Sequence, residues 1–326
     1  MISVLLSIAV ILAIIPGSTQ KDKEGSPREI TVFLDWVPNT NHTGLYVAKD
    51  LGYYSEKGLD VEIIQPSEGG SADLVAAGKG LFGISYQEQV AYARTSKDPL
   101  PVIAIATIIQ HNTSGFASPV DREIKSPADF EGKRYGGWGS PIEEAILEGL
   151  MDKYGVDFTS LEIVNIGAAD FFISTERDVD FAWIYYGWTG IEAEIRGIDI
   201  DFMLLQDLDE RLDFYTPVII TREDTAAGEP GLVRDFLAAT KKGYEYSVED
   251  PGSAASILIE NVREIDSELA TKSQEYLSKN YITDEEGWGF MKASIWETFG
   301  QWMYENDLIP QMLEAEKAFT NDFLMK

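Results

Sequence analysis

The stretch "ITVFLDWVPNTNHTGLYVAKDLGYYSEKGLDVEIIQP" (Ile30–Pro66) decides the fold class of this chain. Residues 30–36 form an apolar run that is typical of a buried strand. Residues 42–58 are predicted as a helix that ends at Gly58, and residues 60–66 again resemble a strand. A strand, a helix and a second strand in this order are the repeating unit of an α/β protein.

The same alternation continues along the chain. We expect a helix over residues 71–80, strands over 81–86 and 101–109, a second alternating block over 133–207 and a strand over 216–224. The chain is then mostly helical from about residue 231 to 323. Two α/β blocks within 326 residues predict two lobes. Residues 113–121 and 216–224 would be the strands that cross between them, with a ligand cleft at the strand ends.

The first residues differ from the rest in composition. "ISVLLSIAVILAII" (Ile2–Ile15) is apolar, too short for a typical membrane span and similar to the core of a signal peptide. We therefore expect an exported protein, with an uncleaved anchor as the alternative. The expected division is an N-terminal apolar segment over 1–17, a linker over 18–29, one lobe from 30–116 with 216–326, and a second lobe from 117–215.

Composition excludes several classes of function. The net charge is −29, with 55 acidic against 26 basic residues, so the chain lacks the cationic surplus that binds nucleic acid. There is no cysteine, and the histidines are only two, which removes thiolate chemistry and most histidine-based metal sites and catalytic triads. We expect no metal, no cofactor and no catalytic residue.

Aromatic and polar side chains gather where strands end. The stretch "DFAWIYYGWTGIEAE" (Asp180–Glu194) places two Trp and two Tyr close together before a helix that carries Glu192. Such rings suit either a core or the stacking wall of a flat, nitrogen-rich ligand. "GGWGSPIEEAI" (136–146) predicts a helix start with a capping box of Ser140 and Glu143. Two glutamates in that first turn disfavour a phosphate.

At these residues the sequence resembles the NMT1/THI5-like group of type II periplasmic binding proteins. Within that group it is similar to binding proteins of ABC importers for a thiamin pyrimidine precursor. The matching pieces include "LDWVPNTNHTGLYVAKDLGYY", "GISYQEQ", "GGWGSPIEEAI" and "LDFYTPV". The resemblance implies a two-lobe α/β fold with an interlobe cleft and a helical C-terminal part. It also implies a monomer that hands its ligand to a permease and an ATPase subunit.

The ligand implied by the resemblance is N-formyl-4-amino-5-aminomethyl-2-methylpyrimidine, stacked on rings and read by a carboxylate. The positions that fall within the family's motifs are Trp36, Asn39, His42, Tyr86, Glu88, Trp138, Trp183, Tyr186, Trp188, Glu192 and Tyr215.

Two alternatives to a pyrimidine-binding protein stay open at this point. The first is the same scaffold with riboflavin or another flat aromatic ligand. The second is a pyrimidine synthase of the same group, whose members carry a Lys and a His four residues apart and a Cys-rich motif. Here those two positions are Ser85 and Gln89, and residues 212–216 read "LDFYT". The expectation is therefore a protein that is not an enzyme.

Overall fold

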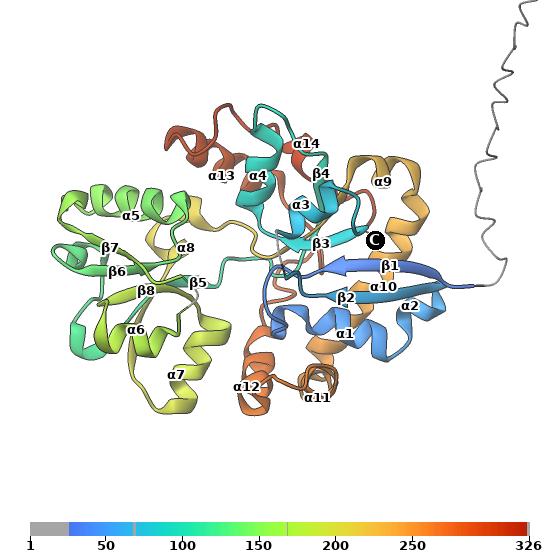
Figure 1. Ribbon diagram of the computed structural model, residues 1–326, viewed down its shortest axis with the longest axis horizontal. Coiled ribbons are helices and arrows are strands. Elements are labelled where there is room, and N and C mark those ends of the chain that lie inside the picture. The colour runs from blue at the N-terminus through green and yellow to red at the C-terminus, as the bar shows by residue number, and fades with distance from the viewer. Residues whose placement is uncertain (1–25, 68–69, 168, 325–326) are drawn as a thin grey trace, which may run out of the picture.

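The computed structural model describes residues 26–67, 70–167 and 169–324 and contains two five-stranded sheets (Figure 1). The first sheet has the order β2 (Leu59–Ile64), β1 (Arg28–Phe33), β3 (Phe82–Ser85), β10 (Val218–Arg222) and β4 (Val102–Thr107). The second has the order β7 (Glu162–Asn165), β6 (Arg134–Gly137), β8 (Phe181–Tyr185), β5 (Ser114–Pro119) and β9 (Ile200–Leu204).

In each sheet one strand is antiparallel to its neighbours. It comes late in the chain in the first sheet and early in the chain in the second. In the first sheet β10 runs antiparallel to β3 and β4, and in the second β5 runs antiparallel to β8 and β9. The parallel strands β1, β2 and β3, like β6, β7 and β8, end at one edge of their sheet. Ligands of open α/β sheets bind at that edge.

Helices surround both sheets. Those that follow strands of the first sheet, and the C-terminal series, are α1 (Thr43–Asp50), α2 (Tyr53–Glu56), α3 (Ser71–Ala76), α4 (Gln87–Thr95), α9 (Glu223–Gly228), α10 (Pro230–Glu249), α11 (Pro251–Asn261), α12 (Ser267–Leu277), α13 (Ala293–Glu305) and α14 (Ala315–Ala318). The second sheet carries α5 (Pro141–Lys153), α6 (Phe171–Arg177), α7 (Ile191–Arg196), α8 (Leu205–Leu208) and a π-helical turn, η5 (Tyr186–Gly190). Short 3₁₀ turns are η1 (Thr40–His42), η2 (Val120–Arg122), η3 (Pro127–Phe130), η4 (Phe158–Ser160) and η6 (Glu210–Leu212).

The long helix α10 packs along α1 through two glycines. A Cβ atom at Gly243 would lie 2.0 Å from the carbonyl oxygen of Gly44, so the two backbones touch. On the sheet side, the ring of Phe236 in α10 stacks on Phe82 of β3 at a centroid distance of 3.8 Å. This packing joins the C-terminal helices to the first sheet.

Local sequence signals explain where helices begin and end. Ser140 and Glu143 form the expected capping box of α5, with Pro141 at its first position. The helix expected over 42–58 is interrupted, because Gly52 adopts a positive φ of 78° between α1 and α2. Strand β1 begins at Arg28, so the last two residues of the expected linker belong to the sheet.

The chain crosses between the sheets through irregular segments, residues 108–113 and 213–217, and not through strands as expected. Strand β5 lies wholly in the second sheet and β10 wholly in the first, so a lobe boundary after residue 116 falls inside β5. The two crossing segments are bonded to each other, since the backbone N–H of Asn112 donates to Asp213 Oδ1 at 2.8 Å. The division of the chain into folding units stays a prediction.

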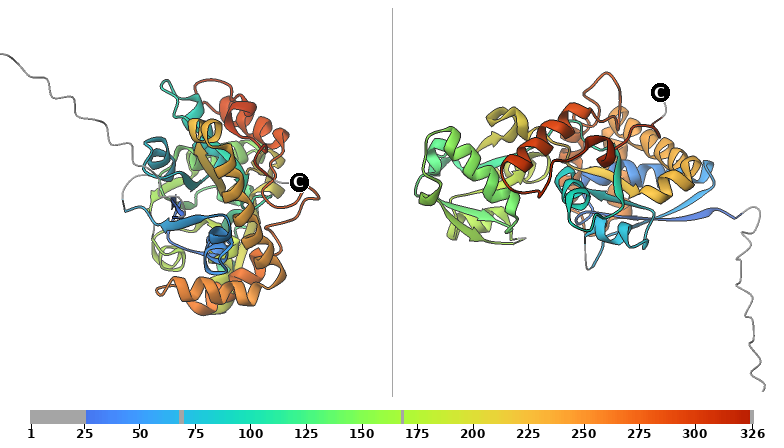
Figure 2. Two further views of the ribbon diagram at one scale, coloured as in Figure 1. Left: turned by 90° about the vertical axis from the view of Figure 1, so that its right-hand side faces the viewer. Right: turned by 90° about the horizontal axis from the view of Figure 1, so that it is seen from above.

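The C-terminal helical part also contacts the second crossing segment. Helix α13 lies beside η6, and the rings of Phe214 and Phe299 stack at 4.2 Å. Figure 2 shows the two sheet-bearing parts side by side, with α13 next to their connection. Among the described residues no helix combines the length and the apolar run needed to cross a bilayer. The expected apolar segment over 1–17 lies outside the described residues.

Candidate functional site

Carboxyl ends of strands from both sheets meet at one place. Tyr185, the last residue of β8, interacts electrostatically with Glu88 at the start of α4, with Asp35 after β1 and with Glu143 at the start of α5. Tyr86 in turn interacts with Asp35, Tyr185 and Glu88. We call the group of Asp35, Tyr86, Glu88, Glu143 and Tyr185 the inter-sheet site.

Asp35 follows β1 and is held as a carboxylate. Its side chain is 5% exposed, and His42 Nε2 lies 2.6 Å from its Oδ1. Burial opposes ionisation of Asp35, but His42 and the hydroxyl of Tyr86 outweigh it and hold the pKa of this carboxyl below its ordinary value. The backbone N–H of Asn39 donates to His42 Nδ1, so Nε2 carries the proton that His42 donates to Asp35.

The candidates Asn39 and His42 therefore have supporting roles. His42 is fully buried between Asp35 and the Asn39 backbone, while the Asn39 side chain caps η1 and bonds to the carbonyl of Val37. This outcome matches the helix-cap alternative for these residues. Trp36, in contrast, is 54% exposed in the same loop.

Glu88 lies in the first turn of α4, three residues after β3. Its Oε2 is buried and has no hydrogen-bond partner among the described residues. Burial raises the pKa of this carboxyl to about 7. Burial also raises the pKa of the neighbouring Tyr86, so below about pH 7 both groups are neutral and carry a hydrogen that they can donate.

The glycine-rich loop after β6 wraps around a carboxylate. Glu143 accepts hydrogen bonds from Tyr135 Oη at 2.6 Å, from the backbone N–H of Trp138 at 3.2 Å and from that of Ser140 at 2.9 Å. The N–H groups that would bind a phosphate at this helix start are therefore already occupied by a negative group. Trp138 itself is 44% exposed.

The aromatic stretch after residue 180 divides into two groups. Trp183 is buried, and its ring lies 5.3 Å from that of Trp138 and 6.1 Å from that of Phe116. Its Nε1 is buried without a partner among the described residues. Tyr185, which the sequence analysis did not select, is the residue of this stretch that joins the inter-sheet site.

The remaining candidates contact other parts of the protein. The hydroxyl of Tyr186 donates to Glu194 at 2.7 Å, and its ring lies against Tyr276. Glu192, on α7, forms an ion pair with Arg196. Trp188 is half-buried in η5. None of these contacts connects Tyr186, Trp188 or Glu192 to Asp35 or Glu88.

Tyr215 is buried and holds the second crossing segment in place. Its hydroxyl accepts a hydrogen bond from the backbone N–H of Lys292 at 2.7 Å. Its backbone N–H donates to Gln87 Oε1 at 2.8 Å, and its carbonyl accepts from the backbone N–H of Gln87. Tyr215 therefore supports α4, the helix that carries Glu88, and is not exposed to a ligand.

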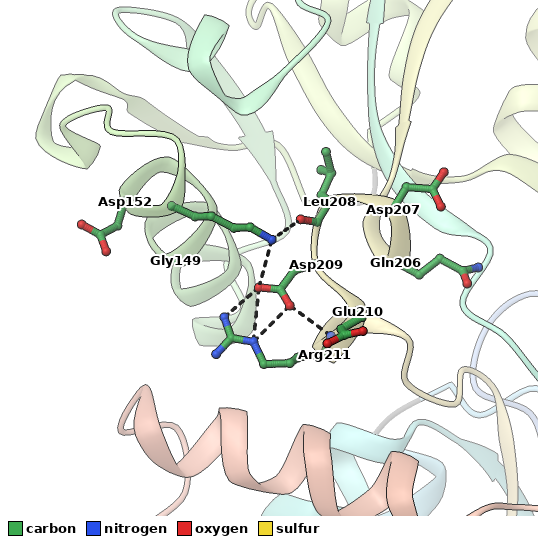
Figure 3. A pocket seen from close by; sticks show the side chains of 9 residues that line it. Gly149, Asp152, Gln206, Asp207, Leu208, Asp209, Glu210 and Arg211 are labelled. Carbon is green, nitrogen blue, oxygen red and sulfur yellow. Dashed lines mark hydrogen bonds and ion pairs between the residues drawn. The ribbon is translucent and has the colours of Figure 1, made fainter.

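A cavity of about 620 Å³ lies elsewhere, between the end of α5 and residues 206–211 (Figure 3). Its two cations are already engaged: Arg211 pairs with Asp209 at 2.7 Å, and Lys153 Nζ donates to the carbonyl of Leu208 at 2.7 Å. Asp152, Asp207 and Glu210 add further acidic groups to the lining. None of its lining residues belongs to the inter-sheet site. The cavity and the inter-sheet site are therefore separate features of the protein.

Of the inter-sheet site, the sequence analysis selected Tyr86 and Glu88, named Glu143 only as a helix cap, and missed Asp35 and Tyr185. Ligand binding by its selected residues stays a prediction. Both missed residues carried a signal. Asp35 stands between a strand and an aromatic residue, and Tyr185 has the same strand parity as Trp183.

Known proteins are similar to this chain in sequence or in fold. The formylaminopyrimidine-binding protein of Halalkalibacterium halodurans is 30% identical over 98% of this chain and 97% of its own length. The 4-amino-5-hydroxymethyl-2-methylpyrimidine phosphate synthase of Legionella pneumophila is 25% identical over 90% of this chain and 92% of its own length. The alkanesulfonate-binding protein of Xanthomonas axonopodis pv. citri has a similar fold, with a TM-score of 0.66 at 12% identity, covering 90% of this chain and 99% of that one.

The fold of these structural neighbours is that of type II periplasmic binding proteins, as expected from the sequence. A family model described as "NMT1/THI5 like" matches residues 39–254. The chain therefore belongs to the NMT1/THI5-like family and has a type II periplasmic binding protein fold.

Proposed function

We propose that this chain is the extracytoplasmic solute-binding component of an ABC importer and captures N-formyl-4-amino-5-aminomethyl-2-methylpyrimidine for thiamin salvage. The observation that carries the proposal is the chemistry of the inter-sheet site. Carboxyl groups from both sheets meet there beside tyrosine hydroxyls and exposed tryptophans. The related formylaminopyrimidine-binding protein supports this choice of ligand.

The charges of the site favour a neutral or cationic heterocycle over an anion. Asp35 is a carboxylate whose partners are a histidine and a tyrosine, and Glu143 fills the loop that would bind a phosphate. A dianion placed beside these buried carboxylates would lose several kcal/mol, about the cost of an unpaired buried charge. An aminopyrimidine instead offers N–H donors to them, each such bond contributing about 1.5–3 kcal/mol.

We also infer that the protein binds its ligand without converting it. In the synthases of this family a lysine and a histidine occupy the positions of Ser85 and Gln89. Here Ser85 Oγ donates to Gln89 Oε1 at 3.0 Å, so the two side chains pair with each other. The chain also has no cysteine for the synthase's Cys-rich motif. We expect a monomer that delivers the ligand to a permease and an ATPase subunit.

Mass spectrometry of the purified protein tests this proposal. After denaturation, the released small molecule should have the mass of the formylaminopyrimidine, and incubation with that compound should yield it back unchanged. Release of riboflavin, or of a phosphorylated pyrimidine, would overturn the choice of ligand. Conversion of the pyrimidine into another compound would overturn the binding-protein assignment.

A further inference from the structure

Glu88 has a buried carboxyl oxygen that nothing in the described chain satisfies. Native proteins rarely leave such an atom unpaired, and when they do a ligand or water usually fills the place. The residue stands at the start of α4, directly behind the end of β3. Its Oε2 is the acidic atom of the inter-sheet site that is left without a partner.

Three neutral hydroxyls interact with Glu88, while the other two carboxyl groups of the inter-sheet site, Asp35 and Glu143, have partners of their own. The hydroxyls are those of Tyr86 at the end of β3, Tyr185 at the end of β8 and Tyr92 one turn further along α4. Burial raises the pKa of Tyr92 to about 12, and it also raises the pKa values of Tyr86 and Tyr185. None of these groups can neutralise a glutamate anion.

Other charged residues near α4 are engaged or turned to solvent. Arg94, on the same helix, pairs with Glu223 at 2.7 Å. Asp73 on α3 is exposed, and Lys317 on α14 pairs with Glu314. Burial is the main cause of the raised pKa of Glu88, and only its own backbone N–H acts in the opposite direction. A second group must therefore enter the site if Glu88 is to be paired.

We propose that ligand capture at this site is proton-linked: Glu88 and a ring nitrogen of the ligand share one proton, while the second carboxyl oxygen accepts a hydrogen bond from an adjacent exocyclic amino group. This inference rests on the proposed function, because it takes a 4-aminopyrimidine as the ligand. It adds the group that reads the ring edge and the number of protons that binding requires.

Glu88 and the ring edge of the ligand have complementary hydrogen-bonding groups only when the shared proton is present. A 4-aminopyrimidine has an acceptor ring nitrogen beside an N–H donor. A neutral carboxyl donates through O–H and accepts through C=O, so it forms two bonds with this edge. If the proton moves to the ring, the same two contacts become charge-assisted. Without it, the lone pairs of a carboxylate oxygen and of the ring nitrogen face each other and repel.

The expected pH dependence follows from the single proton that binding requires. Above about pH 7 the empty site loses its proton, so the affinity of the unaltered protein should fall about tenfold for each further pH unit. An amide offers the same donor and acceptor without a titrating proton. Glu88→Gln should therefore bind about as tightly at pH near 6 and become the tighter binder, by about a hundredfold, at pH near 9.

Calorimetric titration with N-formyl-4-amino-5-aminomethyl-2-methylpyrimidine across that pH range tests the proposal. The ligand's own titration affects the unaltered protein and Glu88→Gln equally. It therefore cancels in the ratio of their dissociation constants. Repetition in buffers of different ionisation enthalpy at the alkaline end should show uptake of about one proton per ligand, and almost none for Glu88→Gln. Asp98→Asn, an exposed carboxylate just beyond α4, is the matched control and should keep the unaltered pH profile.

The outcomes separate this inference from the proposed function. Tight binding of the pyrimidine with a pH-independent ratio, or without proton uptake, would overturn proton linkage and leave the ligand assignment standing. Absence of binding at every pH would overturn the ligand assignment itself. Loss of binding in Glu88→Ala but equal pH profiles for Glu and Gln would also contradict the shared proton.

Discussion

A single buried carboxylate, Glu143, organises the loop in front of α5. It is 2% exposed and receives three hydrogen bonds, from Tyr135, Trp138 and Ser140. Replacing it with alanine would leave these donors unpaired in the interior, where each costs about 1–3 kcal/mol. The same residue thus stabilises the second sheet and excludes an anion from the loop.

We expect Glu143→Ala to lower the free energy of unfolding by about 2–5 kcal/mol, measured by urea denaturation. The neighbouring Glu144 is exposed and serves as the control, so Glu144→Ala should change stability by less than about 0.5 kcal/mol. Equal effects of the two substitutions would show that the loop contacts of Glu143 contribute little.

His111 links the two crossing segments to the C-terminal part and makes stability depend on pH. Its Nδ1 lies 2.6 Å from Asp213 and its Nε2 lies 3.4 Å from Asp284. The hydrogen bond to Asp213 raises the pKa of His111, against the effect of burial, with help from Asp284. Because the folded pKa is raised, this stabilisation is complete below the unfolded value of about 6.5 and is lost as pH rises through the folded value.

Thermal denaturation at about pH 6 and about pH 9 checks this expectation. The unaltered protein should lose more stability between the two conditions than His111→Gln does. Comparing the two proteins cancels Glu88, whose raised pKa also lowers stability as pH rises from about 4.5 to about 7. Identical losses in both proteins would mean that His111 is not charged in the folded state.

At the scale of elements, the π-helical turn η5 touches α12 of the C-terminal series. Ser273 on α12 donates a hydrogen bond to the carbonyl of Gly187, and its hydroxyl also pairs with that of Thr40. A Cβ atom at Gly187 would lie 2.8 Å from the Leu277 side chain and 3.2 Å from the ring of Tyr276. The contact joins the loop after β8 to the part of the protein that packs on the first sheet.

We expect Gly187→Ala to separate η5 from α12 and to weaken ligand binding. Overpacking of this kind costs about 1–3 kcal/mol, which corresponds to an affinity loss of about five- to a hundredfold if the contact belongs to the ligand-bound form. Gly149→Ala in α5 is the control, since a Cβ there meets nothing within 4 Å. Calorimetry on both variants measures the effect, and an unchanged affinity for Gly187→Ala would rule out this contact as part of the ligand-bound form.

The positions of helices and strands were easier to predict from the sequence than the pairing between strands. Strand and helix signals located the alternation of both sheets, because it depends on local apolar pattern. They could not show that β5 belongs wholly to the second sheet, since pairing with β8 and β9 is a long-range property. The break at Gly52 was hidden because the flanking residues favour helix on both sides.

The candidate site was predictable where position along a strand was enough. Tyr86 and Glu88 follow β3 directly and reach the inter-sheet site. Tyr215 and His42 were selected because they fall within the family's motifs, but their burial depends on Lys292 and Asp35, whose positions only the folded chain fixes. The pairing of Glu192 with Arg196 follows from their spacing of four residues on α7, a signal that the sequence analysis did not use.

On the scale of the whole molecule, two sheets are joined by the irregular segments 108–113 and 213–217. Such connections allow hinge closure around a ligand. We expect small-angle scattering to show a smaller radius of gyration when the formylaminopyrimidine is added to ligand-free protein. An unchanged scattering profile at saturating ligand would mean that the sheets keep one arrangement throughout binding.

The central claim is that the inter-sheet site binds an uncharged or cationic aminopyrimidine and rejects its phosphate esters. Calorimetric titration of the ligand-free protein with the formylaminopyrimidine and with 4-amino-5-hydroxymethyl-2-methylpyrimidine phosphate tests it most directly. The account predicts one binding site with micromolar or tighter affinity for the former, and an affinity at least about a hundredfold weaker for the latter. Equal affinities for the two compounds, or binding of the phosphate alone, would contradict it.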